Sequence, residues 1–546
     1  MNSAFSIYTK FGTPLQGPIG FESFLNLPAG WAGFTFDPRL IYDHFHQKFV
    51  LLVLGKDEPN LKSYYWVAVS QGSDPTGGWW VSRFEVTATV NGALSWLDHA
   101  GLTADNWGVY VTGNYFSFSG AFRGSSLWSI NPDILSGGAT NGWRFLDLRW
   151  TITQQAFGLQ PAQPHSVNAD ATTFFVNTFN GVGSQVLLWK LSGDRTNAPS
   201  LTNVAISTAN YEAISNEVDQ PGSAVDIYGG DARVASAVYS QGRVFYVLTD
   251  DVNNNGNSAG WLTVRLNVAT NTNEWQHLLW GGPGVYYFYP ALTILGGDSA
   301  DANLAVFGNW TDTSSSPGQF ASGLYKIYDA QPATTGPLVS FTSGLAAYVA
   351  LDGSGRNRFG SHSGAGYDWS CGHAWGSVEA ADAANTWRTV IAARQLGTEP
   401  VCPQIEVSSP NGGEVWNAGT TRTITWHAQG LGPASGIDIF FDPGTGDVPI
   451  GGPLASSASS FDWQVPGTPT GSARIFVGSW TGAGFEAGDR SDATFTVTAP
   501  DLRVIDPASS ANLLMPGEAF TAQATVSNQG NGSSNVSTSL RFYQST

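Results

Sequence analysis

A strand-length apolar run recurs at regular spacing through the first 400 residues of this chain. The runs begin at Phe49, Val109, Phe174, Val244 and Leu304, with a weaker sixth at Trp375. Their starting positions lie 60 to 71 residues apart. Recurrence at a nearly fixed period indicates a repeat architecture, and it constrains the fold more than any single motif does.

Each repeat carries about four short segments rich in β-branched and aromatic residues. Four antiparallel strands repeated around an axis form the blade of a β-propeller. Helical solenoids do not fit, because the runs are short and bounded by turn residues. The pattern therefore predicts an all-β fold, with a six-bladed β-propeller over residues 1–400. An array of two-sheet sandwiches and a β-helix are the competing folds. We expect residues 5–12 to complete the last blade and so close the ring.

Composition narrows the function classes. Charged residues make up 12% of the 546-residue chain, and the formal net charge is −18. Such an acidic chain is unsuited to neutralising nucleic-acid phosphates. No run approaches the roughly 18 apolar residues of a spanning helix, and the start, MNSAFSIYTKF, does not resemble a signal peptide. We expect no nucleic-acid partner, and we expect that a signal peptide has been removed or that the start of the gene is missing.

The pattern changes near Pro400 and Pro403, which mark a linker. Residues 401–499 contain closely spaced short strands typical of an immunoglobulin-like sandwich. Residues 500–546 hold strands for only part of a second sandwich, and half a sandwich does not bury its apolar face. We expect the missing strands to follow in a longer chain or to come from another molecule.

Several stretches resemble known families. Residues 411–426, NGGEVWNAGTTRTITW, resemble the fibronectin-III-like module of the Ser-Thr-rich, Kre9/Knh1-type cell-wall family. Residues 501–546 resemble the start of a CARDB cell-adhesion module. The first 400 residues resemble secreted bacterial sialidase-like propellers, in pieces such as FDPRLIYD, VAVSQGSDPTGGWW and RNRFGSHSGAGYD. These resemblances imply a secreted or cell-surface multidomain protein of bacterial type, and none of them establishes an activity.

Polar residues recur near the innermost strand of the repeats, where propeller loops form a ligand site. The ligand-binding candidates are Asp37, Arg39, His99, His165, Asp231, Arg233, Arg358 and His362, and the catalytic candidates are Asp98 and Tyr289. Arginine offers a planar fork that holds a carboxylate through two hydrogen bonds. The sialidase resemblance implies that Arg39, Arg233 and Arg358 hold a substrate carboxylate. It also implies that Asp98 is the acid/base and Tyr289 the nucleophile.

The same residues have a purely structural interpretation, because polar groups on inner strands pair with one another or hold channel water. The Phe/Tyr-Arg-Ile-Pro signature of sialidases is absent, since FDPRL has these residues in another order. No glutamate can be assigned to activate Tyr289, although Glu212 and Glu217 are present.

Residues 73–79, SDPTGGW, are a loose version of the Asp-box, a turn between the third and fourth strands of sialidase blades. We expect the carboxylate of Asp74 to accept backbone N–H groups across this turn and Trp79 to pack beneath it. The motif bears on the fold and not on the activity.

Residues 250–256, DDVNNNG, alternate oxygen ligands ahead of a glycine, a pattern that suits Ca²⁺. The ligands of a structural calcium would be Asp250, Asp251, Asn253 and Asn255. Leu262 stands where an EF-hand has its glutamate, so an Asn-rich turn is the alternative. No other cofactor is expected.

The chain has two cysteines, Cys371 and Cys402. One disulfide between them, or two buried free thiols, would account for the pair.

Three functions fit these features. The first is an extracellular recognition or scaffold protein with a non-catalytic propeller that is glycan-binding or adhesive. The second is a sialidase-like glycoside hydrolase. The third is a subunit of a homopolymeric surface filament, in which strand exchange completes the last module.

Overall fold

The computed structural model describes residues 3–8, 10, 12, 14–166, 170–179, 182–214, 218–252, 258–295, 303–328, 335–369, 372–383, 385–395, 403–482, 484–510, 515, 517–532 and 539–541. Over these residues the protein is almost entirely β-structure. It divides into two compact units, Met1–Thr398 and Glu399–Thr546.

The first unit consists of consecutive antiparallel sheets. The first sheet contains β3 (Phe34–Asp43), β4 (Lys48–Asp57), β5 (Lys62–Ser70) and β6 (Trp79–Glu85). The second contains β7 (Ala88–Val90), β8 (Ala93–Asp105), β9 (Gly108–Ser117), β10 (Phe122–Ile130) and β11 (Gly142–Leu148), with the short 3₁₀ turn η1 (Pro132–Ser136) before its last strand.

The next group runs from β12 (Gln160–Pro164) through β13 (Thr173–Thr178) and β14 (Gly183–Ser192) to β15 (Ser200–Tyr211). Strand β12 also pairs in parallel with β16 (Val234–Ser240), which leads β17 (Arg243–Asp251), β18 (Ala259–Asn267) and β19 (Thr272–Leu279). Two further sheets follow: β20 (Val285–Leu295), β21 (Asn303–Asp312), β22 (Gln319–Tyr328) and β23 (Thr335–Thr342), then β24 (Gly364–Asp368), β25 (His373–Ala381) and β26 (Trp387–Gln395).

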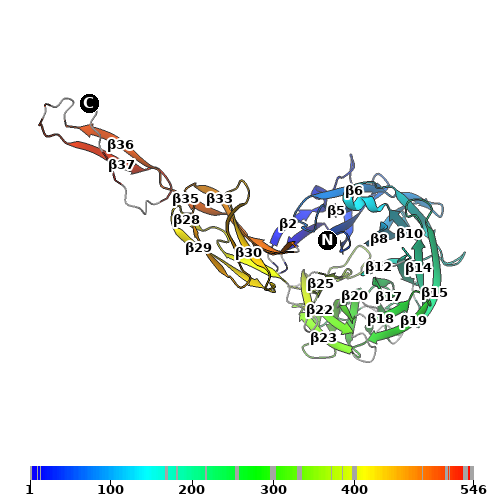
Figure 1. Cartoon of the computed structure of the whole chain (residues 1–546). Helices are drawn as coiled ribbons and strands as arrows, with labels where there is room; N and C mark the ends of the chain where they lie inside the picture. Colours follow the sequence, from blue (N-terminus) through cyan, green and yellow to red (C-terminus); the bar gives the residue numbers. More distant parts are fainter. Residues whose placement is uncertain are drawn as a thin grey trace. The chain divides into compact units, whose positions relative to one another are not determined.

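The leading strands of these groups surround a common centre. Strand β3 contacts β8, β8 contacts β12, β16 contacts β20, and β20 contacts β24. All six of these strands contribute residues to the lining of one central cavity. Figure 1 shows the sheets arranged around this centre in a nearly closed ring. The arrangement brings together strand ends that are far apart in the sequence.

Strand β4 shows why the apolar runs are continuous. Val50 and Leu52 belong to one buried cluster, while Leu51 and Val53 belong to another that includes Phe21. Successive side chains of a strand point to opposite faces of its sheet. A strand that is buried on both faces therefore needs an apolar residue at every position, and each one contributes about 1.5–3 kcal/mol when fully buried.

The N-terminal strand does not complete the last sheet. Strand β1 (Ala4–Tyr8) pairs with β2 (Pro14–Gly20) in a separate two-stranded sheet, and the described last sheet holds β24, β25 and β26. The prediction that residues 5–12 close the ring by pairing is therefore wrong for the described residues. A partner a few residues along the chain costs less loop-closure entropy than one at the far end of the unit. The hairpin is followed by α1 (Phe21–Phe24), on which Phe5 packs.

The second unit has two sheets around one core. One sheet holds β27 (Gln404–Ser409), β29 (Thr421–Gln429) and β32 (Ser460–Gln464). The other holds β28 (Val415–Asn417), β35 (Phe495–Thr498), β33 (Thr470–Thr481), β30 (Gly436–Asp442) and β31 (Val448–Ala455), with β34 (Gly484–Arg490) paired to β33. Trp416, Trp426 and Trp463 lie in the shared core. Both sheets therefore alternate buried and more exposed side chains, unlike β4.

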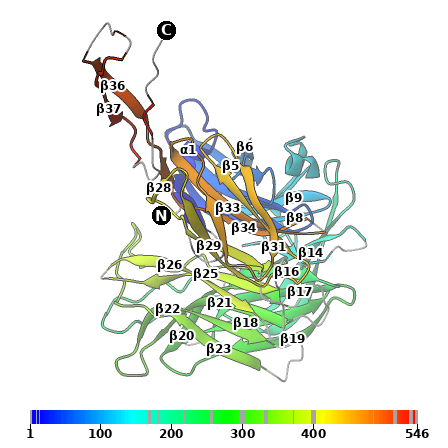
Figure 2. The ribbon, with the colours of Figure 1, turned by 60° about the vertical axis from the view of Figure 1, so that its left-hand side comes forward.

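A two-stranded ribbon, β36 (Leu502–Ser509) and β37 (Ala522–Asn528), follows in the same unit (Figures 1 and 2). Val504 and Val526 on it are 52% and 46% exposed. Completion of this module by further strands or by another molecule stays a prediction. Within the described part of the chain, no helix has the length and apolar character to cross a membrane.

Candidate functional site

Three of the predicted site residues occupy equivalent, unusual backbone positions. Asp37, His99 and Tyr289 have positive φ angles of 45°, 51° and 47°. Each lies in a register shift of a leading strand, between Phe36 and Arg39 in β3, between Asp98 and Gly101 in β8, and between Phe288 and Ala291 in β20. The same bulge is thus built into three sheets.

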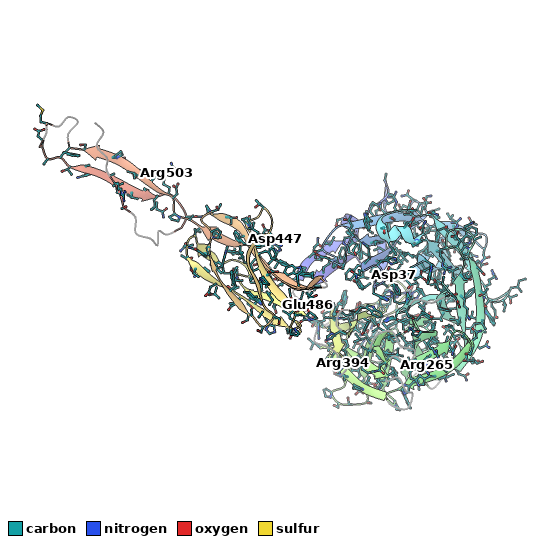
Figure 3. All side chains as sticks on the ribbon, viewed as in Figure 1. Asp37, Arg265, Arg394, Asp447, Glu486 and Arg503 are labelled. Atoms are coloured by element: carbon teal, nitrogen blue, oxygen red, sulfur yellow. The ribbon has the colours of Figure 1, made fainter. Side chains whose placement is uncertain are left out.

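The backbone at these bulges is strained. A non-glycine residue in the left-handed region costs on the order of 1–3 kcal/mol and persists only where the surroundings enforce it. Bulges also re-aim side chains and are frequent beside active sites. Figure 3 labels Asp37 within the ring of the first unit. The backbone is therefore strained at the point where the leading strands bring polar side chains toward the centre.

Asp37 is paired with a histidine from the other end of the unit. Its Oδ1 lies 3.3 Å from Nε2 of His362, just before β24. Burial alone would raise the pKa of Asp37. The hydrogen bond to His362 and the charges of Arg39 and Arg358 outweigh burial and hold this pKa below its usual value. Asp37 is therefore ionised at neutral pH.

Asp98 has the opposite electrostatic state. Burial and then the negative charge of Asp37 raise the pKa of Asp98 to about 6. The backbone N–H of His99 and the charges of Arg233 and Arg358 oppose this rise. Among the described residues, Asp98 forms no ion pair. It is thus a carboxyl group that can hold or release a proton near neutral pH.

Arg233 is held in place by a carboxylate. Its Nε and Nη2 donate to the two oxygens of Asp231 at 2.6 and 2.5 Å. Its guanidinium carbon also lies 4.7 Å from the ring centroid of Phe157. The charge of Arg233 acts on Asp98, His99 and Arg39, which places it in the same group.

Arg39 joins two sheets. Its Nε donates to the carbonyl of Ala100 at 2.9 Å, which links β3 to β8. Burial lowers the pKa of Arg39. The negative charge of Asp37 raises this pKa, whereas the positive charge of Arg233 lowers it further. In the part of the chain that the structure describes, the guanidinium forms no ion pair closer than 4.0 Å, and the residue lines the central cavity.

His99 is a neutral imidazole at neutral pH. Burial and the nearby charges of Arg233 and Arg39 hold its pKa well below its usual value. Its Nε2 lies 3.4 Å from Nε2 of Gln160, and its ring stacks on that of His362 with centroids 6.4 Å apart.

The hydroxyl of Tyr289 is not prepared to act as a nucleophile in this conformation. Its hydroxyl donates to the carbonyl of Tyr228 at 2.9 Å, and burial raises its pKa. Glu212 lies beside Asp250, where its backbone N–H donates to that carboxyl, and Glu217 lies outside the described residues. The described contacts therefore do not supply Tyr289 with the base that a tyrosine nucleophile needs.

Arg358 has an exposed side chain. Its Nε is 3.1 Å from Oδ2 of Asp352, and its side chain is 52% exposed. Its charge still acts on Asp37 and Asp98. The structure therefore gathers Asp37, Arg39, Asp98, His99, Asp231, Arg233, Tyr289, Arg358 and His362 into one group, here called the charged cluster.

His165 does not belong to the charged cluster. It follows the end of β12, whereas the clustered residues lie before or within the leading strands and none follows a strand's end. Its ring contacts those of His44, Tyr367 and Trp369, which follow or end their own strands. Burial and the nearby His44 lower the pKa of His165 to about 3. In this sheet Gln160, at the start of β12, is the residue beside His99.

The central cavity connects these two places. It has a volume of about 350 Å³, with Arg39, Gln160 and His362 in its lining toward the charged cluster. His165 and Trp369 line it toward the other ends of the strands.

The calcium prediction is only partly within the described residues. Asp250 and Asp251 are 3% and 1% exposed, and Asn253 and Asn255 lie outside the described part. Burial raises the pKa of Asp250 to about 7. No set of three metal-ligating His, Cys, Asp or Glu side chains occurs among the described residues. Cys371 and Cys402 both lie outside them.

The turn at Asp74 has the contacts expected of an Asp-box. Its Oδ1 accepts the backbone N–H of Thr76 at 2.8 Å, between β5 and β6, and Trp79 donates to Pro75 at 2.9 Å. A second turn of this kind, not found from the sequence, lies between β14 and β15. There Oδ1 of Asp194 accepts the N–H and the hydroxyl of Thr196, each at 2.9 Å.

Sequence reasoning missed three contributors to the charged cluster. Phe157 lies against Arg233, Gln160 against His99, and Asp352 against Arg358. Gln160 begins the leading strand β12, so alignment of the repeats on strand starts would have found it. Phe157 and Asp352 lie in irregular segments without a repeated counterpart.

No family model and no curated protein matches this chain. Among solved structures it is similar to a protein of unknown function from Dyadobacter fermentans, with 12% identity, a TM-score of 0.33, and coverage of 65% of this chain and 92% of that one. It is also similar to an endo-arabinase from Bacteroides thetaiotaomicron, with 12% identity, a TM-score of 0.26, and coverage of 66% of this chain and 94% of that one. A third similar structure is a Trypanosoma rangeli sialidase in complex with sialic acid, with 9% identity, a TM-score of 0.25, and coverage of 98% of this chain and 92% of that one. Similarity at this level assigns neither an activity nor a ligand.

Proposed function

We propose that the first unit is a six-bladed β-propeller whose charged cluster binds glycans, in an extracellular or cell-surface recognition protein. The observation that carries this proposal is the gathering of acidic, basic and aromatic side chains from successive sheets around one cavity, on backbone that is strained at three equivalent places. Strained backbone of this kind marks functional sites. The six leading strands support the blade count.

The chemistry of the cluster suits sugar hydroxyl groups. A hydroxyl both donates and accepts hydrogen bonds, so a sugar site combines carboxylates with arginine and amide donors. Asp98 and the outer nitrogens of Arg39 form no ion pairs among the described residues, whereas Arg233 is already bound to Asp231. Asp98 and Arg39 are therefore the groups with hydrogen-bonding capacity left for a ligand.

In the same proposal, the second unit serves as a spacer. Two sheets around one core suit an immunoglobulin-like module, and the exposed ribbon β36–β37 suits the start of a CARDB-type module. The domain boundaries in this proposal are residues 1–400, 401–499 and 500–546.

A glycan array tests this proposal. The full chain should bind a subset of immobilised glycans, and Asp98→Asn should weaken that binding at least tenfold. Asp133→Asn is the matched control, because Asp133 is exposed and lies outside the cluster. Absence of binding to every glycan, or equal binding by both variants, would overturn the proposal.

Hydrolysis is the second candidate, favoured by the opposite states of Asp37 and Asp98. Two carboxyl groups whose pKa values are pushed apart are the usual sign of an acid and its charged partner. Asp98 would protonate the leaving oxygen of a glycosidic bond, and ionised Asp37 would stabilise positive charge on the sugar or activate water. This candidate uses no tyrosine nucleophile, because Tyr289 is hydrogen-bonded to Tyr228.

Chromogenic glycosides separate the two candidates. A panel of nitrophenyl glycosides and a fluorogenic sialoside should be turned over if the cluster is catalytic, and Asp98→Asn should reduce turnover at least a hundredfold. Arg358→Ala should affect the sialoside more than neutral substrates. Glycan binding without turnover of any substrate would argue against hydrolysis and in favour of recognition.

A further inference from the structure

Four aromatic side chains form a row beside the charged cluster. Trp96 on β8, Phe116 on β9 and Phe122 on β10 lie opposite one another in the register of the second sheet. Phe157 follows in the segment before β12. The ring centroids of successive members are 6.0, 5.7 and 5.3 Å apart. These four residues are here called the aromatic row.

The aromatic row lies outside the hydrophobic core. None of its four residues belongs to the buried clusters formed by the described part of the chain, and each is partly exposed. Leu97, the residue directly after Trp96, is by contrast buried in a cluster on the other face of β8. A contiguous strip of apolar surface that a protein leaves outside its core marks an interaction site.

The aromatic row borders the charged cluster at two points. Asp98 lies two residues after Trp96, and the pairing of β8 with β9 is regular between them. The two side chains are therefore on the same face of the sheet. At the other end, the guanidinium carbon of Arg233 lies 4.7 Å from the ring centroid of Phe157. A ligand that lies along the row thus passes beside groups of the charged cluster.

Aromatic rings beside polar groups suit sugar residues. One face of a sugar ring carries C–H groups, and its contact with an aromatic ring removes apolar surface from water. The hydroxyl groups at the edge of the sugar remain free to bond to neighbouring carboxyl and guanidinium groups. The spacing of the rings is comparable with the length of one sugar residue in a chain. Four rings extend over more than one such residue, so the row fits a chain and not a single sugar.

The charges beside the aromatic row favour a neutral chain. Lys56 has its Nζ 4.3 Å from the ring centroid of Trp96, and this nitrogen is paired with Glu58 at 3.3 Å. Arg233, at the other end, is paired with Asp231. Both cations next to the row are therefore already compensated, and an acidic sugar stacked on the row would gain little from them.

We infer that the aromatic row binds successive residues of a neutral oligosaccharide or polysaccharide chain, so that the charged cluster recognises a position along such a chain. The inference rests on the proposed function, because the row supplies apolar contacts for the same glycan whose hydroxyl groups meet Asp98. It adds the class of ligand, an extended neutral glycan, to that proposal.

Oligosaccharides of increasing length test the inference. We would measure binding of fragments of one to six residues from cellulose, xylan, mannan and linear arabinan to the full chain by calorimetry. For at least one of these series, the affinity should rise at least tenfold between one and four residues. Oligogalacturonides of the same lengths are the acidic comparison and should bind more weakly than the best neutral series.

Variants of the row separate ring stacking from general apolar contact. Phe116→Leu and Phe122→Leu keep an apolar side chain but remove the ring, and each should weaken binding of the four-residue fragment at least fivefold. Phe122→Tyr keeps the ring and should bind as the unchanged protein does. Trp143→Leu is the matched control, because Trp143 is 39% exposed on β11 of the same sheet and lies outside the row. Thermal melts check that each variant folds.

The outcomes distinguish the inference from the proposed function. Equal affinity for one and four residues, unchanged binding in Phe116→Leu and Phe122→Leu, or binding of the acidic series alone would overturn the inference. Glycan-array binding that Asp98→Asn abolishes, with no neutral series bound, would also overturn it and leave the charged cluster as the glycan site. Absence of binding to every fragment and to every glycan of the array would overturn both.

Discussion

Asp37 on β3 and Asp98 on β8 belong to neighbouring sheets, and the negative charge of Asp37 adds to burial in raising the pKa of Asp98. Asp37 itself is held ionised by His362 and the surrounding arginines. One carboxyl group is thus charged and the other is near its titration point, and this difference depends on the two sheets lying side by side.

The first prediction concerns the stability of Asp98→Asn. The folded-state pKa of about 6 exceeds the unfolded value of about 3.9, so the folded state binds more protons between these values and stability falls as pH rises through this window. Removing the carboxyl should therefore raise the free energy of unfolding at pH 8 by up to about 3 kcal/mol and change it little at pH 3.5. Urea denaturation at both pH values measures this. An equal effect at the two pH values would contradict it, and Asp133→Asn should show no effect at either.

The second prediction concerns the strained backbone at His99. A β-branched residue at φ 51° is an outlier, so His99→Val should destabilise the fold by roughly 2–3 kcal/mol. His99→Asn should cost less, because asparagine tolerates the left-handed region. Leu97→Val, in the same strand with ordinary backbone, should cost about 1 kcal/mol. Equal losses for His99→Val and His99→Asn in chemical denaturation would argue against a backbone origin.

The third prediction concerns a buried arginine that the sequence did not single out. Arg195 is 3% exposed, and its Nε donates to the hydroxyl of Tyr110 at 2.8 Å and its Nη1 to the carbonyl of Gly193 at 2.6 Å. Lysine cannot reproduce this fork, so Arg195→Lys should lower the free energy of unfolding by about 2–3 kcal/mol. Arg358→Lys, on an exposed side chain, should change it by less than about 0.5 kcal/mol. Similar effects of the two changes in thermal unfolding would refute the argument.

The fourth prediction concerns the two aspartate turns. Asp74→Ala and Asp194→Ala each remove an acceptor of a backbone N–H and of a threonine hydroxyl, so each should measurably lower the free energy of unfolding. The turns lie in different sheets, so the double variant should lose the sum of the two effects. Clear non-additivity in the double variant, or no loss in either single variant, would contradict this interpretation.

The repeat of apolar runs predicted the sheets of the first unit, because burial on both faces leaves a continuous apolar signature in each strand. Val50 to Val53 show this directly, with alternate side chains in two different clusters. The turn at Asp74 was predicted for a different reason, which is that its hydrogen bonds join residues close together in the sequence. The pairing of β1 was predicted wrongly, because the sequence of an isolated strand does not specify its partner.

For this protein, the sequence by itself determined the strand periodicity, the change of pattern near residue 400 and the residues that gather near the leading strands, because these depend on local alternation and turn chemistry. Only the tertiary structure decided which polar groups meet. It placed His165 past the end of β12, bound the hydroxyl of Tyr289 to Tyr228, and left Asp98 without an ion pair among the described residues. Burial and the distances between charges set these states, and both arise only when sheets far apart in the chain lie around one centre.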